Sequence, residues 1–240
     1  MRRNGPQPLL LYSYGSYGST SDPYFSSTRL SLLDRGFIFA IANVRGSQIF
    51  GRQSYDDGKL LKKKNTFFDF IDAGKFLINQ NYTDKEHLFC YGGSAGGLLM
   101  GAVVNMEPNL YKGIISNVPF VDVITTMSDP SIPLTTGEYS EWGNPDIKEE
   151  FEYIMQYSPY DNISEQEYPS ILVTAGLWDS QVQYYEPAKY VAKLRDYNKG
   201  KNPILMKVNM TAGHSGVSGR FESLKELAME YAFLLRLDSN

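Results

Sequence analysis

Cysteine and histidine are scarce in this 240-residue sequence. The single cysteine, Cys90, excludes an intrachain disulfide, so we expect a reducing, cytoplasmic location. Two histidines, His87 and His214, are too few for the usual ligand sets of structural zinc. We therefore expect a protein that holds neither a metal nor a cofactor.

Long apolar runs and strong charge are missing as well. No stretch approaches the roughly 20 apolar residues that a membrane-spanning helix needs, and the short run Leu9–Leu11 behind the N-terminal arginines ends at Tyr12. We expect no membrane span and no signal peptide. The net charge is only −4 and the longest basic run is Lys62–Lys64, so nucleic-acid binding is not favoured.

The sequence alternates between two patterns. Short apolar runs rich in β-forming residues and bounded by glycine, proline or asparagine predict strands, and apolar residues at helical spacing predict helices. The predicted strands are Pro8–Tyr12, Gly36–Asn43, His87–Tyr91, Lys112–Val118, Pro169–Ala175 and Pro203–Met210. The predicted helices are Tyr24–Asp34, Asn65–Asn79, Ala95–Met106, Ile147–Gln156, Glu186–Tyr197 and Ser218–Leu237.

This alternation predicts one α/β domain over residues 1–240. Its sheet should be mostly parallel and doubly wound, with helices on both faces and functional side chains on loops at the carboxyl ends of the strands. The stretch Thr125–Pro145 has no clear period. We expect it to be an insertion over the sheet edge, of the kind that often forms a substrate pocket.

The strongest motif is Gly92–Gly97, which matches G-x-S-x-G around Ser94. It follows a predicted strand and precedes a predicted helix, which is the context of the nucleophile elbow in the α/β-hydrolase fold. A sharp turn there exposes the Ser94 hydroxyl, and the backbone amide of Ala95 at the helix start can donate to an oxyanion. Ser94 is therefore the candidate nucleophile.

A serine nucleophile needs a base within hydrogen-bonding distance, and histidine is the commonest one. His87 opens the strand that leads to Ser94, so an extended segment of roughly 20 Å separates the two residues. We expect His87 to be structural or exposed. His214 lies in a loop of small residues directly after the last predicted strand, and by elimination it is the candidate base.

The acidic partner of the histidine should lie between serine and histidine in chain order and follow a strand. Asp179 fits best because it comes just after the strand Pro169–Ala175, where its carboxylate could hold the tautomer of His214. Asp161 and Asp122 remain competitors, since each lies between Ser94 and His214 near a predicted turn or strand end.

With their flanks, these residues resemble the catalytic domain of the prolyl oligopeptidase family of serine peptidases, most closely its oligopeptidase B branch. The resemblance extends over nearly the whole chain. Its segments are Leu9–Tyr17, Tyr24–Leu33, Val44–Gly46, Gly58–Thr66, Gly92–Gly101, Val118–Met127, Pro133–Trp142, Tyr157–Asn162 and Ala212–Arg220.

The resemblance implies cleavage of short peptides through an acyl-enzyme, with Ser94, Asp179 and His214 as a catalytic triad. It also implies that the Tyr14 hydroxyl is the second oxyanion donor beside the amide of Ala95. The same reaction on esters makes a carboxylesterase or other acyl hydrolase the alternative. A catalytically silent domain that binds partners is a further alternative.

The oligopeptidase B branch prefers arginine or lysine before the scissile bond and uses paired glutamates to bind it. Glu138 matches one glutamate, whereas the second falls on Ser140, beside Glu141. Gln181 stands where many members have a substrate-binding arginine. These departures make basic specificity a weaker expectation than the triad.

The resemblance also implies further strands before Pro8 and an N-terminal β-propeller over the active-site face, neither of which we find in the sequence. A catalytic domain without these parts would expose that face. We therefore expect either a propeller partner domain or a homo-oligomer to cover it.

Overall fold

The computed structural model describes residues 5–239. In this part of the chain, six strands form one parallel sheet in the order β2-β1-β3-β4-β5-β6. All six predicted strands are confirmed. They are β1 (Leu9–Tyr12), β2 (Ile38–Ile41), β3 (Leu88–Gly93), β4 (Gly113–Asn117), β5 (Ser170–Gly176) and β6 (Ile204–Asn209).

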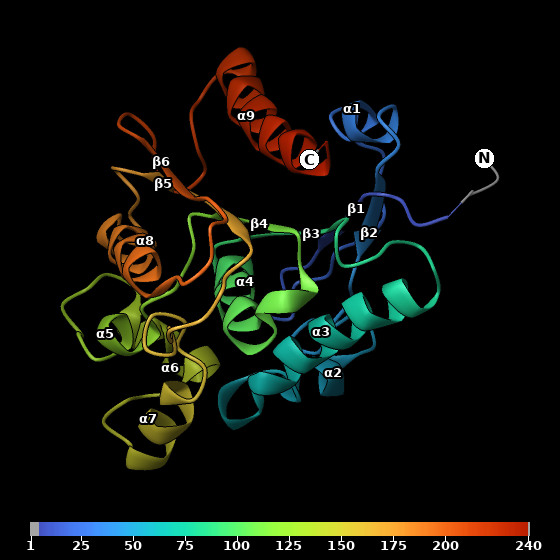
Figure 1. Cartoon of the computed structure of the whole chain (residues 1–240). Coiled ribbons are helices and arrows are strands. Elements are labelled where there is room, and N and C mark those ends of the chain that lie inside the picture. The colour runs from blue at the N-terminus through green and yellow to red at the C-terminus, as the bar shows by residue number, and fades with distance from the viewer. Residues whose placement is uncertain (1–4, 240) are drawn as a thin grey trace.

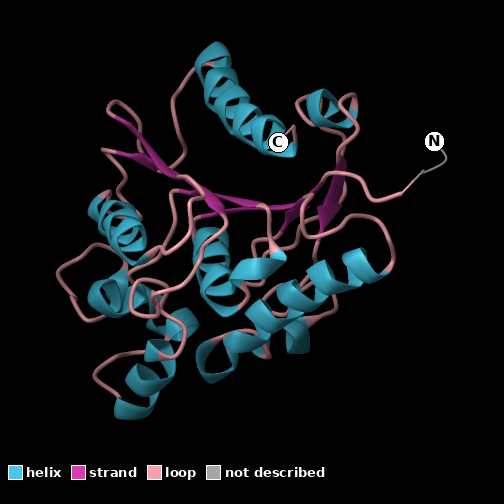
Figure 2. Cartoon of the chain, in the orientation of Figure 1, coloured by secondary structure: helices cyan, strands magenta, loops and turns pink. Residues whose placement is uncertain are grey.

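Helices separate the strands, as predicted, and cover both faces of the sheet. Figure 2 shows α9 and α1 over one face and the other α-helices, among them α3, α4 and α8, over the opposite face. The α-helices are α1 (Leu30–Leu33), α2 (Arg52–Asp56), α3 (Lys64–Asn79), α4 (Ala95–Met106), α5 (Val123–Met127), α6 (Thr135–Trp142), α7 (Lys148–Met155), α8 (Tyr185–Tyr197) and α9 (Arg220–Asp238). Two short 3₁₀ helices, η1 (Leu60–Lys62) and η2 (Pro108–Leu110), complete the set in the described residues.

The core consists of two layers, one on each side of the sheet. Successive side chains of a strand point to opposite faces. Leu9 and Leu11 of β1 accordingly belong to the larger layer, which includes buried residues of α3 and α4. Leu10 belongs to the smaller layer with Phe233 and Leu234 of α9. Burial on both sides explains why the strands are continuous apolar runs.

Two sequence-based expectations were wrong. The predicted helix Tyr24–Asp34 is helical only at Leu30–Leu33. The Arg29 side chain donates to the Tyr24 carbonyl at 3.1 Å, and in a helix this carbonyl would accept the amide four residues later.

The second correction concerns the aperiodic stretch Thr125–Pro145, which contains the end of α5 and all of α6. It lies beside the carboxyl ends of the central strands β3 and β4 instead of the sheet edge, because Leu134 and Thr135 line a cavity together with Ser94 and Phe120. The sequence pattern of α6 is weak because this helix is only eight residues long and contains Gly137. Its buried Trp142 holds it to the core instead.

The strand order places two loops at the centre of the molecule. β1 lies between β2 and β3, so the chain runs outward to one side from β1 and crosses to the other side at β3 (Figure 1). In open parallel sheets, ligands bind in the crevice at the carboxyl ends of the strands where the order reverses. The loops after β1 and β3, which carry Tyr14 and Ser94, flank this crevice.

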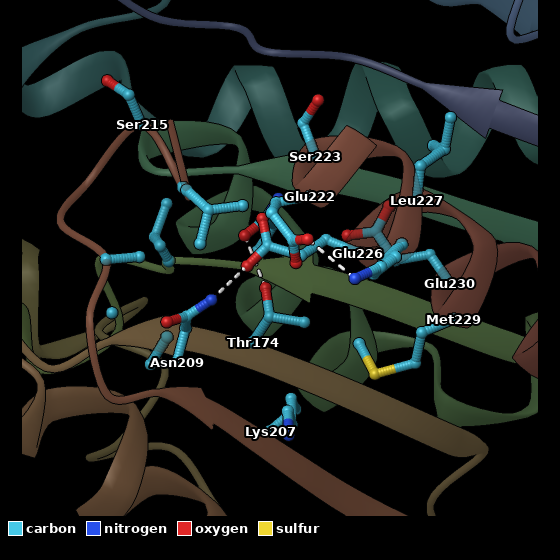
Figure 3. Close-up of a pocket in the computed structure, with 18 of the residues that line it drawn as sticks. Thr174, Lys207, Asn209, Ser215, Glu222, Ser223, Glu226, Leu227, Met229 and Glu230 are labelled. Atoms are coloured by element: carbon cyan, nitrogen blue, oxygen red, sulfur yellow. Dashed lines mark hydrogen bonds and ion pairs between the residues drawn. The ribbon is translucent and has the colours of Figure 1, made fainter. Parts of the chain in front are cut away.

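Helix α9 stands over the sheet with a cavity beneath it. The cavity has a volume of about 510 Å³ and lies between α9, strands β3–β6 and the loop that joins β6 to α9 (Figure 3). Glu226 and Glu230 of α9 lie along it, and Glu226 accepts a hydrogen bond of 2.7 Å from the Asn209 amide. Lys207 and Tyr91 face the same space from the sheet.

Glu230 is a carboxyl group whose pKa this environment moves into the neutral range. Glu230 is only 6% exposed. Burial, with a smaller contribution from the charge of Glu226, raises the pKa of Glu230 from 4.5 to about 7. The folded chain therefore holds a proton there across a pH range in which the unfolded chain has lost it.

None of the helices formed by residues 5–239 combines the length and the apolar character that crossing a bilayer requires.

We predict that Glu230→Gln changes the pH dependence of stability. Because the folded-state pKa is raised, the contribution of Glu230 is fully present below pH 4.5 and is lost as the pH rises through about 7. Glutamine cannot ionise, so the unfolding free energy of the variant should gain on the wild type by about 2 to 3 kcal/mol between pH 5 and pH 8. Urea unfolding at both pH values measures this difference.

Glu222→Gln is the matched control, since Glu222 is exposed on the same helix and pairs with Lys225. Its effect on stability should stay within about 0.5 kcal/mol. Parallel pH profiles for the wild type and Glu230→Gln would contradict the assignment of a raised pKa to Glu230.

Candidate active site

Ser94 occupies a sharp turn between β3, which ends at Gly93, and α4, which begins at Ala95. Its backbone has φ 56° and ψ −118°, a conformation that side chains of L-residues rarely adopt. Glycine at position 92 makes the turn possible, because a Cβ there would stand 2.2 Å from the carbonyl oxygen of Gly96. The turn is the strand–turn–helix arrangement that the motif predicts.

Hydrogen bonds hold the turn from several sides. The Ser94 amide donates to the carbonyl of Asn117 at the end of β4, at 2.9 Å. The Ser94 carbonyl accepts from the amides of Leu98 and Phe120 at 3.1 and 3.2 Å. Because the Ala95 amide is the first of α4, it has no partner within the helix and can donate to a bound group.

His214 lies in the loop between β6 and α9, and its imidazole contacts Ser94. The distance from His214 Nε2 to Ser94 Oγ is 3.0 Å, although the two residues are 120 positions apart in sequence. The other ring nitrogen, Nδ1, lies 2.8 Å from Asp179 Oδ2. The His214 side chain is 14% exposed, so one edge of the ring borders solvent.

Asp179 follows β5, and backbone amides hold the carboxylate oxygen that does not contact His214. Its Oδ1 accepts the backbone amides of Gln181 and Val182, both at 2.9 Å. The side chain is only 2% exposed. The two amide donors fix the orientation of the carboxylate, so its other oxygen points at His214.

The competing residues lie elsewhere. Asp161 accepts a hydrogen bond of 2.6 Å from the hydroxyl of Ser158. Asp122 is buried and forms an ion pair with Lys189. His87, at the amino end of β3, contacts Asp84 at 2.8 Å. The structure therefore brings Ser94, His214 and Asp179 together. Asp161, Asp122 and His87 have other partners and are not part of this group.

Tyr14 approaches Ser94 from the loop that follows β1. The Tyr14 hydroxyl lies close to the Ser94 side chain, and burial raises the pKa of the Tyr14 phenol above its ordinary value. A group with a raised pKa stays protonated at neutral pH, so it remains a hydrogen-bond donor. The tyrosine also packs over the helix start, where a Cβ on Gly96 would meet Tyr14 Cα at 3.4 Å.

A small cavity of about 70 Å³ opens beside Ser94 and Ala95. Its wall includes Glu138 and Trp142 of α6, and Gln181 contributes to its rim. Glu138 Oε2 accepts hydrogen bonds from Tyr17 Oη at 2.7 Å and from Trp142 Nε1 at 3.2 Å. Glu138 is thus a carboxylate held in place on the cavity wall.

Glu141 does not supply a second charge to this wall. It is 2% exposed and accepts from the Tyr17 amide at 2.9 Å and from the Tyr55 hydroxyl at 2.6 Å. Ser140, the position matched to the second glutamate of the pair, is exposed. Glu138 is therefore the one carboxylate among the described residues that line this cavity.

Three residues at the site escaped the sequence analysis. Tyr17 and Trp142 orient Glu138, and Lys63 is buried against the loop after β1, where it donates to Gly15 and Ser16. Lys63 belongs to the run Lys62–Lys64, which looks like exposed charge in the sequence. The only available signal for the aromatic residues was their place in the segments of the family resemblance.

The chain is similar in sequence to known proteins. A model of the prolyl oligopeptidase family matches residues 23–239. The chain is 58% identical over 233 residues to dipeptidyl aminopeptidase BI of Pseudoxanthomonas mexicana, covering 97% of this chain and 32% of that protein. It is 56% identical over 232 residues to protease 2 of Moraxella lacunata, covering 97% and 34%.

Solved structures agree with the sequence relatives. Oligopeptidase B from Leishmania major superposes with a TM-score of 0.97 at 51% identity, covering 98% of this chain and 33% of that one. Oligopeptidase B from Trypanosoma brucei, solved in a closed form with covalently bound antipain, gives 0.97 at 48% identity, covering 100% and 34%. The chain spans about a third of the length of these relatives.

Proposed function

Because the chain belongs to the prolyl oligopeptidase family, we propose that it is a serine peptidase that cleaves short peptides through an acyl-enzyme. The observation behind this proposal is the continuous chain of contacts from Ser94 Oγ to His214 Nε2 at 3.0 Å and from His214 Nδ1 to Asp179 Oδ2 at 2.8 Å. Nucleophile, base and orienting acid are spaced for proton transfer.

In the first half of the reaction, Ser94 Oγ attacks the carbonyl carbon of the peptide bond and His214 accepts the hydroxyl proton. Asp179 stabilises the imidazolium that forms. His214 then gives the proton to the leaving amine, and the acyl group stays on Ser94. Water, deprotonated by His214, attacks the ester in the second half and releases Ser94.

The negative charge that develops on the carbonyl oxygen needs donors that are already in place. The Ala95 amide follows Ser94 directly at the start of α4, and the Tyr14 hydroxyl approaches Ser94 from the loop after β1. We infer that together they bind the oxyanion. Burial keeps the Tyr14 phenol protonated, which this role requires.

The cavity beside Ser94 supports a preference for a basic side chain before the scissile bond. Glu138 Oε2 accepts hydrogen bonds from the Tyr17 hydroxyl and the Trp142 indole. Its other oxygen, Oε1, can therefore accept a hydrogen bond from a guanidinium or ammonium group of the substrate. A single carboxylate gives a weaker preference than a pair would. Gln181 at the rim can donate to the substrate backbone in place of the arginine that many relatives have.

We further infer that residues 1–240 form a peptidase catalytic domain whose active-site face is covered in the working protein. Trp178 and Leu134 support this inference, because they are 71% and 54% exposed beside Asp179 and the cavity. Exposed large apolar side chains are typical of contact surfaces. A β-propeller domain or a second copy of the chain would cover these two side chains. The cytoplasmic location expected from the sequence stays a prediction.

We predict that substitutions in the site separate into two sizes of effect. Ser94→Ala and His214→Ala should each lower kcat by about 10⁶, because they remove the nucleophile or its base. Tyr14→Phe should lower kcat by about 10²–10³, the cost of one oxyanion donor. His87→Ala is the matched control, since His87 lies at the opposite end of β3 and should leave turnover unchanged.

A fluorophosphonate probe and three substrates identify the class of activity. The proposal expects labelling that disappears in Ser94→Ala, together with turnover of an arginyl amide, a prolyl amide or both. Turnover of a short-chain nitrophenyl ester alone would assign an esterase instead. Folded protein that takes up no label would identify a silent binding domain.

We predict that Glu138→Gln lowers kcat/KM for an arginyl amide by about 10- to 100-fold, the range expected for a lost charged hydrogen bond. A neutral substrate such as a prolyl amide should be affected less than 3-fold. Glu149→Gln, at an exposed position of α7, is the control. An equal loss for both substrates would show that Glu138 supports the fold of the cavity and does not select the charge.

A further inference from the structure

The loop that carries Tyr14 has no regular secondary structure of its own. We call residues Ser13–Gly18 the Tyr14 loop. It leaves β1 at Tyr12 and turns at Gly15, where φ is 73°. An oxyanion donor must be held to within a fraction of an ångström, since small misplacements cost large factors in rate. The contacts that hold this loop therefore matter for the chemistry at Ser94.

Two of these contacts come from Lys63. This residue precedes α3 and is only 1% exposed, which is rare for a lysine. Its ammonium donates to the Gly15 carbonyl at 2.7 Å and to Ser16 Oγ at 2.8 Å. It also lies 5.1 Å from the centre of the Trp142 ring, a distance at which the ring attracts a cation.

A buried carboxylate grips the same loop one residue further on. Glu141 of α6 accepts a hydrogen bond from the Tyr17 amide at 2.9 Å. Burial lowers the pKa of Lys63 to about 7, and the charge of Glu141 acts in the opposite direction, favouring the charged lysine. A positive and a negative group thus hold three consecutive residues, Gly15, Ser16 and Tyr17, directly after Tyr14.

Burying a charged ammonium costs several kcal/mol unless good partners compensate it. An apolar residue would fill the same volume at no such cost, so the general stability of the fold does not explain a lysine here. The partners of Lys63 point to another reason. Two of them belong to the loop that presents Tyr14, and the third, Trp142, orients Glu138 on the cavity wall.

We propose that Lys63 is a positioning residue that holds the Tyr14 hydroxyl at the oxyanion site through its hydrogen bonds to Gly15 and Ser16. This inference rests on the proposed function, since it assigns Lys63 a role in the same reaction. Lys63 does not touch the substrate. It acts indirectly, because its hydrogen bonds hold Gly15 and Ser16 and thereby fix the position of Tyr14, the residue before them.

Lys63→Met tests the proposal, because methionine keeps the buried volume and removes the charge and the donors. We expect kcat to fall about 10- to 100-fold with KM changed less than 3-fold. In a Tyr14→Phe background the same substitution should cost less than 3-fold, since the donor that Lys63 positions is already gone. A merely structural role would give the same factor in both backgrounds.

Lys62→Met is the matched control. Lys62 is the neighbouring lysine, exposed and paired with Asp57 at the surface, and its removal should leave kcat and KM unchanged. If Lys63→Met does not fold, Ser16→Ala replaces it, because it removes one acceptor and leaves the lysine in place. Ser16→Ala should lower kcat several-fold, again only when Tyr14 is present.

Two results would overturn the inference. One is a folded Lys63→Met, or in its place Ser16→Ala, with the kcat of the wild type. The other is a loss that is fully additive with Tyr14→Phe. Ser94→Ala separates this failure from that of the proposed function: if Ser94→Ala and Tyr14→Phe lose activity as expected, only the role of Lys63 is wrong. If the protein shows no Ser94-dependent turnover, the proposed function itself is wrong.

Discussion

The site depends on one strained backbone position, Ser94. Its φ of 56° is a conformation that costs on the order of 1–3 kcal/mol for a residue with a side chain. The cost is tolerated because β3 and α4 are both firmly packed and the turn between them has only one residue to reverse direction. The same strain exposes the hydroxyl toward His214 and leaves the Ala95 amide at the start of α4 free of intrahelical bonding.

Buried ionisable side chains hold the irregular loops that follow the strands of the sheet. Asp179 accepts two backbone amides in the loop after β5. Glu186 of α8, whose pKa burial raises to about 7, accepts the amides of Val121 and Asp122 in the loop after β4. In the loop after β1, Glu141 accepts the amide of Tyr17 and Lys63 donates to the carbonyl of Gly15.

This use of buried charge has a common physical basis. A loop exposes backbone donors and acceptors that no neighbouring strand or helix turn satisfies. A charged group in a region of low dielectric forms strong hydrogen bonds with them and fixes their direction. The different roles of Glu138 and Glu141 have the same explanation. Glu141 binds the backbone and is buried, whereas Glu138, three residues earlier, keeps an oxygen for the cavity.

By itself, the sequence determined the strand order along the chain, the long helices and the candidate nucleophile, because these follow from local periodicity and from a short motif in its context. The candidate base followed from the presence of only two histidines, and the candidate acid from its place after a strand and before His214. It did not reveal α6, whose eight residues are held by the burial of Trp142, nor that the helix predicted from Tyr24 begins only at Leu30. Lys63 shows the limit most clearly. Within the run Lys62–Lys64, nothing local distinguishes a surface charge from a buried one, and only the packing of α3 against the Tyr14 loop decided which lysine lost its water.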